Sequence, residues 1–118
     1  MQKYLLSTVI GCAALLFATT ANARSYDGSW SLVFFTQRGA CDTYNFSVNI
    51  NHGVVTHPNL VKFRGYVGRS GAVRASVTVH DKYASGSGRL TEDSGRGIWN
   101  GRAAGERCSG YWTAQRNQ

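Results

Sequence analysis

The sequence predicts an all-β protein in which an antiparallel meander of about eight strands forms a small up-and-down β-barrel. Apolar residues recur with a period of two, and no segment combines the period of a helix with helix caps. Short segments rich in Gly, Asn, Asp and Ser separate the apolar runs at intervals typical of a meander. Glycines recur on one face of the last three runs, which favours a strongly bent, closed sheet.

The clearest strand covers residues 44–51, where Tyr44, Phe46, Val48 and Ile50 alternate with polar residues. One apolar face and one polar face are typical of a half-buried antiparallel strand. The same signals, followed along the chain, predict strands at residues 28–36, 43–51, 53–57, 60–67, 72–80, 83–90, 95–101 and 107–114.

The last three predicted strands place glycines and tryptophans on their inner faces. These inner-face residues are Ala84, Gly86, Gly88, Leu90, Gly97, Trp99, Gly101, Cys108, Gly110, Trp112 and Ala114. Glycine weakens a strand unless the fold needs the space. Either the sheet bends sharply at the glycines, or Trp99 and Trp112 fill the space above them. Both alternatives favour a closed barrel, which also removes the exposed sheet edges.

Residues 1–23 have the pattern of an export signal. Lys3 provides a positive start, residues 4–17 are largely apolar, and Ala21-Asn22-Ala23 provides a small-residue cleavage site. The apolar run is too short for a membrane span, so we expect a single mature domain, residues 24–118, without a transmembrane segment. Its expected location is the periplasm or the exterior. A lipid anchor through Cys12 is the alternative, disfavoured because it would leave an apolar segment at the new N-terminus.

The mature chain keeps two cysteines, Cys41 and Cys108. In an oxidising compartment an even pair without CxxC spacing is typical of one structural disulfide. It would close a loop of 68 residues, counting both ends, and chain entropy sets its upper contribution at about 4 kcal/mol. A redox or metal pair is the alternative, but neither cysteine has a nearby resolving thiol or ligand.

Gly28-Ser29-Trp30 resembles the opening strand of lipocalins, avidins and small periplasmic inhibitors of bacterial metalloproteases, all eight-stranded barrels. The lipocalin resemblance implies that an Arg near the last strand, here Arg116, covers the Trp through a cation–π contact. Over residues 26–116 the chain is also similar to a group of small exported β-rich proteins of alphaproteobacteria, of unassigned function. That resemblance implies export, one disulfide and a β fold, and it transfers no catalytic residue.

The mature domain is basic. Loss of residues 1–23 removes Lys3 alone, so the net charge falls from +7 to +6, and most of the remaining cations are Arg. Arg favours planar anions such as carboxylate and phosphate. The candidate anion-binding residues are Arg64, Arg74, Arg89 and Arg107. Expected partners are an anionic polysaccharide, lipopolysaccharide or an acidic protein. Nucleic acid is disfavoured for an exported protein, and a merely basic surface is the alternative reading.

Signals for enzymatic chemistry are weak. His80-Asp81 fits a turn better than a catalytic pair, and the few acidic residues form no paired-carboxylate motif. His52, His57 and His80 lack a diagnostic metal-ligand spacing. We therefore expect a non-enzymatic protein with no catalytic residue, no metal and no cofactor.

The predicted function is that of an exported binding or interaction protein whose site is the barrel interior or mouth. The candidate ligand-binding residues are Trp30, Trp99, Trp112 and Arg116. Two alternatives remain: an electrostatic binder of anionic envelope polymers through surface Arg, and an inhibitor of an extracellular hydrolase.

Overall fold

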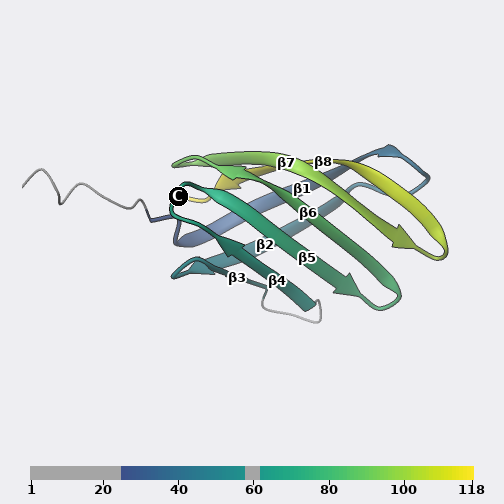
Figure 1. Cartoon of the computed structure of the whole chain (residues 1–118), viewed down its shortest axis with the longest axis horizontal. Helices are drawn as coiled ribbons and strands as arrows, with labels where there is room; N and C mark the ends of the chain where they lie inside the picture. Colours follow the sequence, from purple (N-terminus) through teal and green to yellow (C-terminus); the bar gives the residue numbers. More distant parts are fainter. Residues whose placement is uncertain (1–24, 58–61) are drawn as a thin grey trace, which may run out of the picture.

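The computed structural model describes residues 25–57 and 62–118, whose eight antiparallel strands follow one another around a closed barrel (Figure 1). The strands are β1 (Gly28–Arg38), β2 (Tyr44–Asn51), β3 (Val54–Thr56), β4 (Lys62–Val67), β5 (Ala72–Val79), β6 (Lys82–Leu90), β7 (Ser94–Ala103) and β8 (Glu106–Arg116). Strand β1 pairs with both β2 and β8 and so closes the barrel. No helix occurs in these ranges, and the predicted all-β meander barrel is confirmed.

The strand boundaries lie within two residues of the predicted ones where the structure describes them. The β7–β8 hairpin is longer at both ends than predicted, and its pairing runs from Ser94↔Gln115 to Ala103↔Glu106. The extension reaches a two-residue turn because Ala104 and Gly105 both adopt left-handed backbone angles, φ 52° and 80°. Such a turn matches the twist of the flanking strands. The predicted export signal, Cys12 and the first two residues of the predicted strand 60–67 lie outside the described residues.

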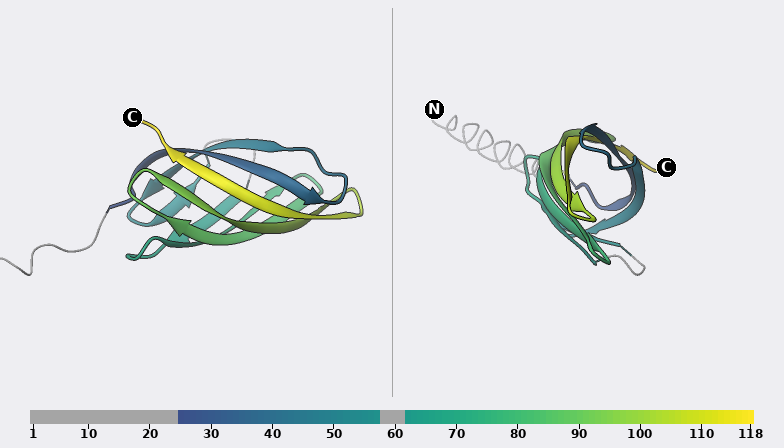
Figure 2. Two further views of the ribbon diagram at one scale, coloured as in Figure 1. Left: turned by 90° about the horizontal axis from the view of Figure 1, so that it is seen from above. Right: turned by 90° about the vertical axis from the view of Figure 1, so that its right-hand side faces the viewer.

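The two ends of the barrel differ. One end carries the N-terminal approach to β1, the turns β2–β3, β4–β5 and β6–β7, and the C-terminus. We call it the closed end. The opposite end carries the β1–β2 loop and the turns β5–β6 and β7–β8, and we call it the mouth. The mouth faces the viewer in the right-hand view of Figure 2, where the strands form a ring.

Trp30 closes the first of these ends. Its side chain is completely buried, and its indole N–H donates a hydrogen bond of 2.8 Å to the carbonyl of Tyr26. The guanidinium carbon of Arg116 lies 5.4 Å from the centroid of the Trp30 ring. Arg116 also donates to the carbonyls of Glu92, at 2.8 Å, and of Asp27. The predicted cation–π cover is thus confirmed, and Arg116 ties the β6–β7 turn to the start of β1.

A disulfide fixes the wall near the mouth. Cys41, in the β1–β2 loop, is bonded to Cys108 on the inner face of β8, with 6.1 Å between their Cα atoms. The predicted pairing is confirmed. A structural disulfide in so small a domain fits an extracytoplasmic location, because reducing compartments keep cysteine thiols in the reduced form.

Candidate ligand-binding site at the barrel mouth

The space above the inner-face glycines of β6 and β7 is occupied by Trp112. A Cβ atom built on Gly88 would lie 2.6 Å from Cζ2 of Trp112, and one built on Gly97 would lie 2.6 Å from the same atom. The indole N–H of Trp112 donates to the carbonyl of Ser87 at 3.3 Å. The Arg96 carbonyl lies closer still to the Gly88 position, and the Ser87 carbonyl to the Gly97 position, so close strand approach as well as filling by Trp112 requires glycine there. These glycines therefore leave no free volume for a ligand at Trp112.

Trp99, on β7, is likewise fixed by a hydrogen bond to the backbone. Its ring is buried, and its N–H donates to the carbonyl of Phe35 at 3.0 Å. The inner-face glycine paired with Trp99 is Gly110. A Cβ there would collide with the Phe35 carbonyl, next to the register shift between Thr36 and Arg38. All three indole N–H groups are thus bonded to backbone carbonyls.

The four candidate ligand-binding residues do not form one site. Trp30 and Arg116 seal the closed end, Trp112 lies in the middle of the interior, and only Trp99 lines a cavity at the mouth. Sequence periodicity placed Trp99 and Trp112 on inner faces, but the end of the barrel at which each lies depends on the register of all eight strands.

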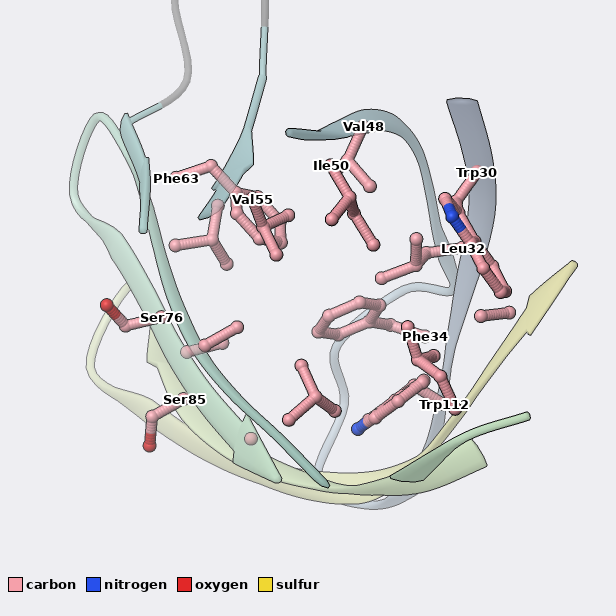
Figure 3. Close-up of a pocket in the computed structure, with 17 residues that line it drawn as sticks. Trp30, Leu32, Phe34, Val48, Ile50, Val55, Phe63, Ser76, Ser85 and Trp112 are labelled. Atoms are coloured by element: carbon pink, nitrogen blue, oxygen red, sulfur yellow. The ribbon is translucent and has the colours of Figure 1, made fainter. Parts of the chain in front are cut away.

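The barrel interior keeps a small apolar cavity of about 40 Å³. Figure 3 shows Trp30, Leu32, Phe34 and Val55 pointing into it. A volume of this size holds a few water molecules at most, and apolar walls disfavour water. The deep interior is therefore core packing rather than a binding chamber.

A larger cavity of about 160 Å³ opens at the mouth. Its walls are inward-facing apolar side chains contributed by five strands: Phe34, Tyr44, Phe46, Val77, Val79, Ala84 and Trp99. An apolar cavity near this size can stay dry and take up a benzene-sized molecule. This is the part of the described interior that has room for a ligand group.

Aromatic rings form one side of the mouth cavity. The ring of Phe46 lies edge-on to Phe34, with 5.5 Å between centroids, and to Phe63, at 6.2 Å. The Phe34 ring lies 5.8 Å from Trp99. Edge-to-face rings at these distances stabilise one another beyond their buried area. The cluster therefore gives the cavity a preformed wall.

The charged side chains that line the mouth cavity are both cations, although Asp42 and Asp81 lie in the neighbouring β1–β2 loop and β5–β6 turn. The Lys82 ammonium lies 5.5 Å from the centroid of the Tyr44 ring, which belongs to a strand far from β6 in the barrel order. Arg102 and Lys82 are the charged residues that line the cavity, and no described carboxylate does. Glu106, close to the mouth, accepts a hydrogen bond from the Ala40 N–H at 3.3 Å. The geometry favours an apolar group inside and an anionic group at the rim.

No sequence pattern marked Tyr44, Phe46 or Lys82 as a site residue. Their alternation placed Tyr44 and Phe46 on an inner face, and the order of a meander places the start of β2 at the opposite end from the start of β1. That signal could have located them at the mouth. The contact of Lys82 with Tyr44 depends on the width of the barrel, which no local pattern encodes.

The four candidate anion-binding residues divide into a pair and two separate cations. Arg64 on β4 and Arg74 on β5 line one outer groove. Arg89 donates to the Ser70 carbonyl at 3.1 Å near the closed end, and Arg107 lies near the mouth on β8.

His52 and His80 occupy turns at opposite ends of the barrel. Within residues 25–57 and 62–118, no three His, Cys, Asp or Glu side chains are grouped so that they could hold a metal ion. The same ranges contain no helix long and apolar enough to cross a membrane. Comparison of the chain with protein-family models, with curated proteins and with solved structures finds no match.

Proposed function

We propose that this protein is an exported, non-enzymatic binding protein that takes the apolar part of a small anionic amphiphile into the mouth of its barrel. The observation that carries the proposal is the apolar cavity of about 160 Å³ with Lys82 and Arg102 at its rim. Apolar burial supplies the main affinity, because each buried methylene contributes about 0.8 kcal/mol.

The two rim cations select the headgroup. An exposed ion pair contributes about 0.2–1 kcal/mol, less than the burial of a short alkyl chain. Lys82 and Arg102 are both solvent-exposed, so they bias binding toward a carboxylate without supplying most of its energy. A neutral ligand of the same length should bind a few-fold more weakly, and its affinity should be insensitive to salt.

Export rests on the signal pattern of residues 1–23 and is supported by the Cys41–Cys108 disulfide. Mass spectrometry of the protein recovered from its native host tests it. We expect a chain that begins at Arg24 and lacks two hydrogens relative to the dithiol form. A diacylated chain beginning at Cys12 would instead support the lipid anchor.

The binding test compares octanoate with 1-octanol, titrated into the mature protein by calorimetry and followed through tryptophan fluorescence, because Trp99 lines the cavity. Ala84→Leu extends an apolar side chain into the cavity and should abolish binding of both ligands. Ala72→Leu, on the exposed face of β5, is the matched control and should bind normally. Lys82→Gln with Arg102→Gln should weaken octanoate about 2–10-fold and leave octanol unchanged.

Two results would overturn this function. One is that the folded protein binds neither octanoate nor 1-octanol, nor any longer or shorter homologue of them. The other is binding that Ala84→Leu leaves intact, since the ligand would then occupy another surface.

A further inference from the structure

Acidic and basic side chains occupy different parts of the barrel. The acidic ones lie at or near its ends, and a set of basic ones lies on its wall. All six acidic residues lie in loops, in turns or at the first residue of a strand: Asp27, Asp42, Asp81, Glu92, Asp93 and Glu106. The exposed cations on the outer faces of β4 to β8 are Lys62, Arg64, Arg74, Arg89, Arg96, Arg102 and Arg107. Strands β2 and β3 contain no charged residue. One side of the barrel wall is therefore basic along its length, with the carboxylates kept to its margins.

A groove runs across this basic wall. The strand register aligns Arg64, Ser76, Ser85 and Asn100 in one row from β4 to β7. The next row contains Tyr66, Arg74, Ser87 and Ile98. These two rows line a single surface hollow, which we call the wall groove.

The hollow follows from the sizes of the side chains. Ser76 and Ser85 point away from the barrel interior (Figure 3), yet both are only partly exposed. They lie between taller residues on either side, with Tyr66 69 % exposed and Ile98 64 % exposed. Ser76 and Ser85 are direct cross-strand partners on β5 and β6, so their short side chains form the floor between these taller residues.

The groove has the chemistry of a carbohydrate site. Serine hydroxyls both donate and accept hydrogen bonds, and an asparagine amide does the same, so its floor matches the hydroxyl groups of a sugar. Arg64 and Arg74 are diagonal neighbours on adjacent strands, which places them about 7–8 Å apart at the backbone. Each guanidinium can hold a carboxylate in a two-pronged hydrogen bond.

Nucleic acid fits the groove less well. Single strands bind to positive grooves in which successive bases stack on aromatic rings. Tyr66 is the one aromatic residue that lines the wall groove within the described part of the chain. The next aromatic residue along that row, Tyr111, stacks on Phe35 with 4.8 Å between centroids, so one face of its ring is already covered.

We propose that the wall groove binds a segment of an acidic polysaccharide, with Arg64 and Arg74 on its carboxylates and the serine–asparagine row on its hydroxyls. The site is separate from the mouth cavity and does not depend on it. Affinity for such a polymer should fall steeply as salt increases, because exposed charges are screened.

The test measures binding of the mature protein to three immobilised probes at low and high salt: alginate, neutral dextran and a single-stranded oligonucleotide. Arg64→Gln with Arg74→Gln should weaken alginate binding about tenfold. The control, Arg38→Gln with Arg69→Gln, removes the same charge outside the groove and should change affinity twofold or less. Ser85→Leu fills the floor without altering charge and should also weaken alginate binding, while the circular dichroism spectrum stays that of the wild type.

Equal losses in the two arginine double variants would overturn the proposal, since the whole basic surface would then be responsible. Equal binding of dextran and alginate would do the same, because the guanidinium groups would have no role. Tighter binding of the oligonucleotide than of alginate, sensitive to the Arg64 and Arg74 changes, would assign the groove to nucleic acid instead. A variant that loses octanoate binding but still binds alginate would bear on the mouth-cavity proposal alone and would support the independence of the wall groove.

Discussion

The packing of Trp112 over Gly97 makes the stability of this barrel unusually sensitive to one added methyl group. In Gly97→Ala the new Cβ would lie 2.6 Å from both Cε2 and Cζ2 of Trp112 and would also collide with the Ser87 carbonyl. The carbonyl belongs to the paired strand β6, so it can retreat only if β6 and β7 separate. The indole can move toward the small interior cavity, but it then loses its 3.3 Å hydrogen bond to that same carbonyl.

The expected cost is the sum of two effects. Overpacking a well-filled core typically costs about 1–3 kcal/mol, and a lost hydrogen bond costs about 1 kcal/mol. We expect the free energy of unfolding to fall by about 2–4 kcal/mol. For a domain of this length, that corresponds to a fall in Tm on the order of 10–30 °C. Such a loss is a large fraction of the stability of a small domain.

Urea denaturation of the mature protein, followed by tryptophan fluorescence and circular dichroism, measures this cost. Gly68→Ala is the matched control, because its added Cβ would have one non-adjacent neighbour within 4 Å among the described residues, the Ala72 carbonyl at 3.8 Å. We expect that variant to stay within about 0.5 kcal/mol of the wild type. A Trp112→Phe background reduces the ring that the new Cβ would meet but leaves the Ser87 carbonyl in place, so Gly97→Ala should lose only part of its cost there. Equal stability of Gly97→Ala and Gly68→Ala, or strict additivity with Trp112→Phe, would refute the packing argument.

Three further perturbations test the closed end and the disulfide. Cys41→Ser with Cys108→Ser should lower the free energy of unfolding by about 2–5 kcal/mol. A reducing agent should destabilise the wild type and leave this double variant unchanged. A wild type whose stability does not change on reduction would contradict a structural role for the disulfide. Arg116→Ala removes the cover of Trp30 and two hydrogen bonds, so we expect a loss of about 2–3 kcal/mol in urea denaturation. Arg116→Lys should recover little of it, because a lysine cannot span both carbonyls and the ring; full recovery would show that charge alone matters.

Local sequence patterns were sufficient to predict most of the fold. Alternation at Tyr44–Ile50 fixed which side chains face inward, and residues able to adopt left-handed backbone angles marked the turns, as at Ala104-Gly105. The disulfide followed from the count of cysteines left after the signal. These features are set by the two-residue period of a strand and by turn sterics, both of which act within a few residues.

The candidate site was only partly predictable, for a physical reason. Whether an inner tryptophan lines a cavity or fills one depends on which residues the neighbouring strands bring beside it. Trp112 meets Gly97 across one strand pair, and its indole reaches Gly88 one strand further on. Lys82 meets Tyr44 across the mouth. Register and barrel width set these contacts, and neither is a local property of the chain.

Strand β6 brings the two proposed sites within one residue of each other. Ala84 faces inward and lines the mouth cavity, whereas Ser85 faces outward (Figure 3) and lines the wall groove. The same enlargement to leucine at these two adjacent positions therefore acts on opposite faces of a single sheet. If both proposals hold, Ala84→Leu removes octanoate binding and keeps alginate binding, and Ser85→Leu does the reverse. A loss of both activities in either variant would mean that the wall itself had been distorted, because two independent surfaces cannot otherwise respond together.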